Sequence, residues 1–168
     1  VAYVGDFNNV ARSLAEVSAL LGMHIRFACP HGFDAPLVEL ERFELLGAPS
    51  VDQSHRPVDA VAGAHAVHTD TWVSMGQEAE KQERMQQFEG YTVDDDMMAL
   101  ADPTAVFMHC LPAYRGIEVA AGVIDGPQSV VFQQAHNRLH AARGALAFLL
   151  HSTPPEPVSP GTTIGGAS

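Results

Sequence analysis

The fold follows from one stretch of the sequence, residues 64–76, which reads AHAVHTDTWVSMG. Its apolar first part, 64–69, predicts a buried strand, and a polar run of helical character follows at 77–88. The strand would end at Asp70, and the chain would turn through Ser74 into the helix. In an open parallel sheet this arrangement places a carboxylate, a hydroxyl and backbone N–H groups at the edge where ligands bind. An ordinary loop with a helix cap at Ser74 is the alternative that this segment alone leaves open.

Outward from this stretch, apolar runs alternate with helical periodicities, as in a parallel sheet covered by helices. Strands are predicted at 1–4, 23–29, 64–69, 105–108 and 129–132. Helices are predicted at 10–21, 37–46, 58–62, 77–88, 94–100 and 134–150, with a short one from Ile117 and a loop or irregular edge piece at 50–58. The sequence therefore predicts an α/β fold: a three-layer, Rossmann-like domain with a parallel five-stranded sheet flanked by helices.

The composition limits the classes of function. The 168 residues, 46% hydrophobic and 17% charged, suit one soluble domain, expected at 1–151. A formal net charge of −11 argues against binding to nucleic acid or to an anionic membrane. The two cysteines form no disulfide framework and favour a reducing compartment, the cytoplasm.

The two ends of the chain carry their own expectations. Residues 152–168 are rich in proline, glycine, serine and threonine, a composition typical of a disordered tail. No apolar run approaches the roughly 20 residues of a membrane-spanning helix, and no signal peptide is recognisable. The chain opens on a strand without an initial methionine, so we expect it to be a piece of a longer protein.

Polar side chains follow four of the predicted strands. They are Asp6, Asn8 and Asn9; Asp70 and Ser74; His109 and Cys110; and His136, Asn137 and Arg138. Because the carboxyl ends of parallel strands share one edge of the sheet, these side chains are expected to meet in one crevice. Together they predict a site for a polar small molecule.

Each candidate has a plainer alternative. Asn9 could bind a carboxylate or an amino group, or could cap a helix. Asp70 could pair with an ammonium group, or could serve the turn. The Cys110 thiol could face the crevice, or could be a small buried apolar group. Arg138, expected in the first turn of the last helix, could bind an anion or form a surface ion pair.

The sequence lacks the motifs that are typical of several cofactor sites. The turn after the first strand reads GDFNNV, without the glycines that a dinucleotide site needs. Neither a phosphate-binding G-x-x-x-x-G-K-[ST] loop nor a G-x-S-x-G nucleophile turn occurs. The spacing of ligands typical of zinc is absent, and the adjacent His109 and Cys110 would point to opposite faces of a strand. We therefore expect neither a cofactor nor a metal.

Four short motifs follow one another along the chain: GDFNN at 5–9, DTWVSMG at 70–76, HCLPA at 109–113 and Asn137-Arg138. Together they resemble the ornithine carbamoyltransferases, specifically their C-terminal, ornithine-binding domain. The resemblance covers roughly residues 1–150. The family's second motif is its ornithine-recognising loop, and aspartate carbamoyltransferases carry a different one.

The resemblance implies a reaction and a set of site residues. Carbamoyl phosphate and L-ornithine would give L-citrulline and phosphate, a step of arginine biosynthesis. Asp70 and Cys110 would lie near the reacting amine, with Arg138 as a third catalytic residue. The substrate-binding residues carried over from the family are Asn9, Asp70, Ser74 and Met75 for ornithine, and Cys110, Leu111 and Arg138 for carbamoyl phosphate.

The family's N-terminal carbamoyl-phosphate domain, with its STRTR loop, is absent from this sequence. The fragment alone is therefore expected to be inactive, and full-length relatives are expected to form homotrimers. The sequence departs from the family at His136, where a glutamate is usual, and at Tyr114 and Ile117. Two alternatives stay open: a stand-alone, non-catalytic amino-acid-binding module, and a carbamoyltransferase for a related amine such as putrescine or an acylated ornithine. The intact Ser74-Met75-Gly76 argues against the second.

Overall fold

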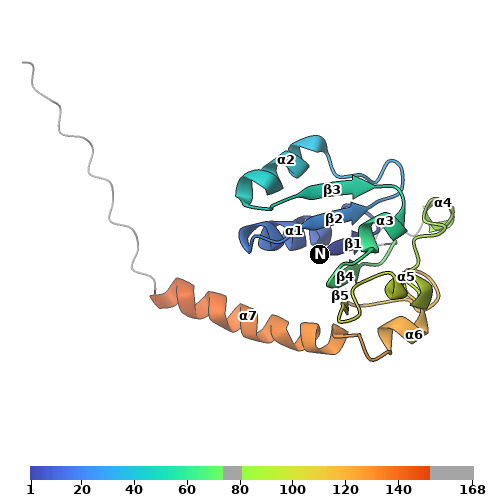
Figure 1. Ribbon diagram of the computed structural model, residues 1–168. Coiled ribbons are helices and arrows are strands. Elements are labelled where there is room, and N and C mark those ends of the chain that lie inside the picture. Colours follow the sequence, from blue (N-terminus) through green and yellow to red (C-terminus); the bar gives the residue numbers. More distant parts are fainter. Residues whose placement is uncertain (74–80, 152–168) are drawn as a thin grey trace, which may run out of the picture. The chain divides into compact units, whose positions relative to one another are not determined.

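The computed structural model describes residues 1–73 and 81–151 (Figure 1). Contacts divide the chain into two units, Val1–His136 and Asn137–Ser168, and the sheet lies entirely in the first. Among the described residues, no helix combines the length and the apolar character needed to cross a membrane. The predicted tail at 152–168 lies outside the described residues.

The sheet has five parallel strands in the order β3-β2-β1-β4-β5. They are β1 Ala2–Val4, β2 Ile25–Ala28, β3 Val51–Ser54, β4 Ala66–Thr69 and β5 Val106–His109. From β1 the chain builds outward to β2 and β3, and then returns to place β4 on the other side of β1. The strand order thus reverses between β1 and β4, and such a switch point opens a crevice at the carboxyl ends of the strands.

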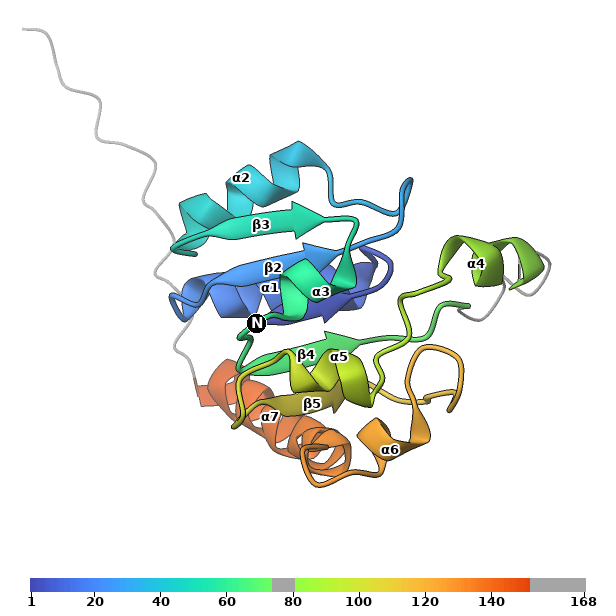
Figure 2. The same ribbon diagram turned by 45° about the vertical axis from the view of Figure 1, so that its right-hand side comes forward.

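Helices cover both faces of the sheet (Figure 2). The described helices are α1 Asn9–Leu20, α2 Leu37–Leu46, α3 Pro57–Val61, α4 Lys81–Gln87, α5 Asp95–Ala99, α6 Ala121–Ile124 and α7 Val131–His151, and α7 runs on into the second unit. Alternation along β1 divides the apolar core, because Tyr3 packs with α1 and α2 whereas Ala2 and Val4 pack with α3, α5 and α6. This three-layer α/β fold confirms the prediction.

One predicted strand is wrong. Residues 129–132 form no strand: Val131 and Phe132 begin α7, and Ser129 makes only an isolated bridge to Phe107. The fifth strand is instead β3, within the segment interpreted as loop or edge piece. A short apolar run fits a helix start as well as a strand, and β3 is a half-exposed edge strand that needs no apolar run.

The smaller helices agree in part with the sequence. The helix expected from Ile117 begins only at Ala121, after the turn that contains Glu118. The helix expected at 77–88 is described from Lys81 to Gln87, and its first part lies outside the described residues. In α2, Gly47 ends the helix as predicted, with a left-handed φ of 119° that suits glycine.

Candidate functional site

Asn8 joins the two strands at the switch point. Its side-chain oxygen caps α1 by accepting hydrogen bonds from the N–H groups of Val10 and Ala11, at 2.9 and 3.0 Å. Its side-chain nitrogen donates to Oδ2 of Asp70, at 2.9 Å, across from β1 to β4. One amide thus begins a helix and orients a carboxylate of the candidate site.

Asp70 lies where β4 ends, and only 7% of it is exposed. Besides Asn8, its carboxylate accepts from the N–H of Thr71 at 2.8 Å and from the Cys110 thiol at 3.0 Å. Donors from the turns after β1 and β5, and from the next residue of its own segment, therefore converge on one buried acid. This degree of satisfaction is what a buried carboxylate requires, and it holds the carboxylate in one orientation.

The turn after β5 brings Cys110 to Asp70. Leu111 has a left-handed φ of 58°, and its N–H donates to Nδ1 of His109 at 2.9 Å. This turn ends the strand alternation, so the prediction that His109 and Cys110 point to opposite faces is wrong. Ligand atoms of Asp70, His109 and Cys110 instead lie within 4.8 Å of one another. Both ring nitrogens of His109 already face protein atoms, so a metal at this group would displace one of them.

The structure describes only some of the other predicted site residues. Asn9 is exposed at the start of α1, and among the described residues its side chain forms no hydrogen bond. Leu111 is partly buried in the turn beside Cys110. Ser74 and Met75 lie outside the described residues.

Arg138 is an exposed residue of α7, in the second unit. The sequence placed it in the first turn of the last helix, and this is wrong, because α7 begins at Val131 rather than at 134. Arg138 therefore lies about two helical turns after the first residue of α7, Val131. The field of a helix N-terminus fades within its first turn, so that argument for an anion site at Arg138 no longer holds.

Sequence reasoning missed Arg84, which lies in the polar helical run predicted at 77–88. Arg84 is buried, donates to Asp6 at 3.1 Å and to the carbonyl oxygen of Trp72 at 2.7 Å, and lies over the ring of Phe33. It therefore ties the turn after β1 to the segment after Asp70. Its spacing of four from the buried Phe88 was the available signal for a buried helix face.

Tyr3, in β1, also contacts Asn8. Its hydroxyl donates to the side-chain oxygen of Asn8 at 3.3 Å. Burial, with a further contribution from nearby Asp70, raises the pKa of Tyr3 well above its usual value. The hydroxyl therefore remains a donor throughout the physiological range.

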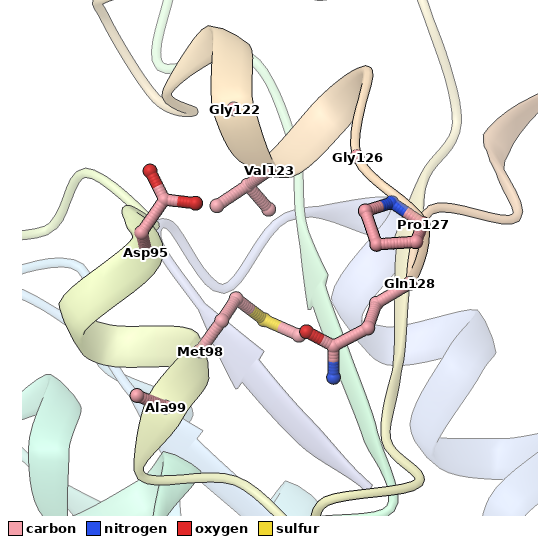
Figure 3. Close-up of a pocket in the computed structure, with 8 residues that line it drawn as sticks. All are labelled: Asp95, Met98, Ala99, Gly122, Val123, Gly126, Pro127 and Gln128. Carbon is pink, nitrogen blue, oxygen red and sulfur yellow. The ribbon is translucent and has the colours of Figure 1, made fainter.

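A small pocket lies elsewhere, between α5 and α6 (Figure 3). Its walls are Asp95, Met98, Ala99, Gly122, Val123, Gly126, Pro127 and Gln128. The volume of about 230 Å³ is below the roughly 300–1,000 Å³ of typical ligand pockets. None of the residues at the switch point lines it, so the candidate site is the Asp70–Cys110 pair and not this pocket.

Known proteins share both the sequence and the fold. A family model described as aspartate/ornithine carbamoyltransferase, Asp/Orn binding domain, matches residues 1–149. The chain is 48% identical over 153 residues to an ornithine carbamoyltransferase of Geobacillus stearothermophilus, covering 89% of this chain and 49% of that protein.

Solved structures agree with this match. Ornithine carbamoyltransferase from Pyrococcus furiosus superposes with a TM-score of 0.80 at 45% identity, over 87% of this chain and 48% of that one. The enzyme from Giardia lamblia gives a TM-score of 0.81 at 37% identity, over 90% and 50%. The chain thus spans about half the length of its relatives. By sequence and by fold, the chain belongs to the aspartate/ornithine carbamoyltransferase family, in which it matches the Asp/Orn-binding domain.

Proposed function

We propose that this chain is the ornithine-binding half of an ornithine carbamoyltransferase. The complete enzyme would transfer the carbamoyl group of carbamoyl phosphate to the side-chain amine of L-ornithine, giving L-citrulline and phosphate. The observation that carries the proposal is the bond of 3.0 Å between the Cys110 thiol and the buried Asp70 carboxylate, at the switch point of the sheet. The relatives named above add support, because they are ornithine carbamoyltransferases.

The reaction needs a neutral amine, because only a free lone pair attacks the carbamoyl carbon. Asp70 attracts the cationic side chain of ornithine, and the Asp70–Cys110 pair orients the amine and assists removal of its proton. A C–N bond then forms, the bond from the carbamoyl carbon to the phosphate oxygen breaks, and phosphate leaves with that electron pair. The proton lost by the amine passes through the pair toward the departing phosphate or solvent.

The remaining roles follow the resemblance to the family. Asn9 binds the amino-acid end of ornithine together with Ser74 and Met75. Leu111 and Arg138, with Cys110, contact carbamoyl phosphate. Arg138 offsets negative charge on that substrate, as a guanidinium does at phosphoryl and carbonyl oxygens.

The wider context is part of the same proposal. A second domain supplies most of the carbamoyl phosphate site, and the complete protein acts as a cytoplasmic homotrimer in arginine biosynthesis. Residues 1–151 form the ornithine domain. Neither a cofactor nor a metal takes part in the proposed reaction.

A chimaera tests the proposal directly. The chain replaces its matching half in the Geobacillus stearothermophilus enzyme, to which it is 48% identical. Citrulline formation from ornithine and carbamoyl phosphate is then measured beside the intact relative and the chain alone. We expect activity from the chimaera and none from the isolated chain. A folded, trimeric chimaera that forms no citrulline would contradict the proposal.

Two further measurements separate the alternatives. Calorimetric titration of the isolated chain with ornithine tests the amino-acid-binding module, since Asn8, Asp70 and Cys110 all come from this chain. Tight binding without turnover in the chimaera would favour that module. A panel of ornithine, putrescine and acylated ornithine in the chimaera tests the choice of amine, and the highest kcat/KM is expected for ornithine.

A further inference from the structure

A buried acid lies behind the candidate site. Glu118, in the turn before α6, has no exposed surface, and neither has His109 at the end of β5. Oε1 of Glu118 lies 3.5 Å from Nε2 of His109 and also accepts a hydrogen bond from the N–H of Tyr114. Its Oε2 has no hydrogen-bond partner among the described residues. A carboxylate this deeply buried destabilises the fold unless hydrogen bonds or an opposite charge compensate for the loss of solvation.

The contacts of His109 assign its tautomer. Nδ1 of the ring accepts the N–H of Leu111 at 2.9 Å, so it carries no proton. The ring proton must therefore lie on Nε2, which faces Glu118. Nε2 forms no hydrogen bond among the described residues, but the negative carboxylate oxygen 3.5 Å away favours a proton there over a lone pair.

The turn that holds Cys110 depends on that tautomer. Leu111 has a φ of 58°, a left-handed conformation that costs a non-glycine residue roughly 1–2 kcal/mol. The bond from its N–H to His109 offsets part of this cost. Cys110 lies between the two bonded residues, so the direction of its thiol toward Asp70 follows from the same turn.

We propose that Glu118 is a positioning residue, which acts through His109 and the Leu111 turn to hold the Cys110 thiol against Asp70. Glu118 makes polar contacts with His109 and with the N–H of Tyr114, so it acts through His109 and takes no proton from substrate. Its catalytic consequence rests on the proposed carbamoyl transfer, whereas the positioning itself can be measured without catalysis.

The first test follows the thiol. Cys29 is fully buried, so iodoacetamide reports on Cys110, with mass spectrometry of peptides to separate the two. A carboxylate beside a thiol disfavours the reactive thiolate, so displacing Cys110 from Asp70 should speed alkylation. We expect Glu118→Met to alkylate severalfold faster than the unchanged chain, and Glu118→Gln, which keeps an acceptor, to stay close to it. Glu89→Met, at an exposed glutamate, is the matched control.

Three results of this test would overturn the positioning role. The first is an unchanged alkylation rate in folded Glu118→Met. The second is an equal rise in Glu118→Met and in Glu89→Met. A faster rate that persists unchanged when Asp70→Asn is added would also count against it, since the effect should vanish once the carboxylate is gone.

A second test needs no substitution at Glu118, which matters if Glu118→Met does not fold. Nitrogen NMR of labelled histidines reads the tautomer of His109, with His109→Asn to assign its signals. The proposal requires an unprotonated Nδ1 and a protonated Nε2. A proton on Nδ1, in either the other tautomer or the cation, would break the bond from Leu111 and overturn the proposal.

The third test uses the chimaera. Glu118→Met should lower kcat by about 10–100-fold, as small misplacements of reacting groups do, while KM for ornithine stays near its original value. Glu118→Gln should restore most of kcat. A parallel rise in KM, or no rescue by glutamine, would contradict the positioning role. A parent chimaera without activity would sink the proposed function and leave the alkylation and NMR results standing.

Discussion

Two cysteines each follow a strand of the same sheet, yet they differ in chemistry. Cys29 comes directly after β2 and is completely buried. Burial, with lesser contributions from Asp34 and Asp6, raises the pKa of its thiol to about 12. Cys110 comes directly after β5, is partly exposed, and donates its thiol proton to Asp70.

The difference lies in how each strand ends. At the carboxyl end of β2 (the β2 edge), Cys29 continues the alternation of Ile25 and Phe27 into the core, where its thiol meets the backbone of Ala35. Its carbonyl accepts from the Tyr91 hydroxyl at 3.0 Å and bonds Nδ1 of His55 at 2.9 Å. At the carboxyl ends of β4 and β5 (the β4–β5 edge), the left-handed Leu111 ends the alternation and turns the Cys110 thiol toward Asp70 at the end of β4. A residue type at a strand end therefore acquires a role only through the turn that follows.

The largest effect is expected from Asp70→Asn in the chimaera. The amide lacks the charge that attracts the substrate ammonium and cannot take a proton, so kcat/KM should fall by about 10²–10⁴-fold. Citrulline formation measures it, and ornithine titration shows whether binding is lost as well. Tyr91→Phe at the β2 edge is the control and should keep its activity. Similar losses in both variants would remove the distinction between the two edges.

Alkylation of the unchanged chain compares the two thiols directly. Cys110 should react with iodoacetamide at least about 100-fold faster than Cys29, because Cys29 is both inaccessible and resistant to ionisation. Peptide mass spectrometry follows each site with time. The preference should disappear in guanidinium chloride, where the fold is lost. Comparable rates in the native chain would show that the β2 edge is open to reagent.

Acid should weaken the β4–β5 edge through His68, which stacks on Tyr3 and contacts Gln134. Burial, assisted by nearby His109, lowers the pKa of His68 from 6.5 to about 4. Above pH 6.5 the group is neutral in both states and costs nothing. As the pH falls toward 4, the unfolded chain takes up a proton that the folded chain resists, and the free energy of unfolding drops.

The size of that drop is of the order of 3 kcal/mol, since each pKa unit corresponds to about 1.4 kcal/mol. Urea unfolding of the unchanged chain and of His68→Gln should diverge as the pH falls from 6.5 to about 4, with the unchanged chain losing more. His65→Gln serves as control, because the His65 side chain is 82% exposed. Parallel curves for all three proteins would contradict the assignment to His68.

The smallest effect is expected from Tyr91→Phe. The Tyr91 hydroxyl lies 2.7 Å from the His55 carbonyl oxygen and 3.0 Å from that of Cys29. Removing it leaves one buried and one part-buried carbonyl oxygen without this donor, which should cost about 1–2 kcal/mol in the free energy of unfolding. Urea unfolding near neutral pH measures it. An unchanged free energy would show that the β2 edge does not depend on this contact.

Much of the fold is readable from local patterns. Strands β1, β2, β4 and β5 fall within or beside the predicted runs, and α1 and α2 lie within a residue of their predicted bounds. These elements carry strong apolar periodicity and clear stop signals such as Gly47. The edge strand β3 and the start of α7 were misassigned, because an exposed strand and a short apolar run carry weak local signals.

The sequence predicted several residues of the candidate site, but few of the contacts between them. Asp70 and Cys110 were named from the polar strand ends and the resemblance, and the structure brings them together. Asn8 was placed at the right strand end without its bridging role, and Arg84 and the pair of His109 with Glu118 carried no recognised signal. Burial of a charged residue depends on neighbours that lie far away in the sequence.

By itself, then, the sequence determined the class of fold, most of the element boundaries and the family, since these rest on periodicity, turn residues and short motifs. Only the tertiary structure decided which side chains meet. Asn8 and Asp70 are 62 residues apart, and Asp70 and Cys110 are 40 apart. Both contacts exist because β4 pairs with β1 on one side and with β5 on the other. That pairing follows from packing of the whole chain, and no local pattern contains it.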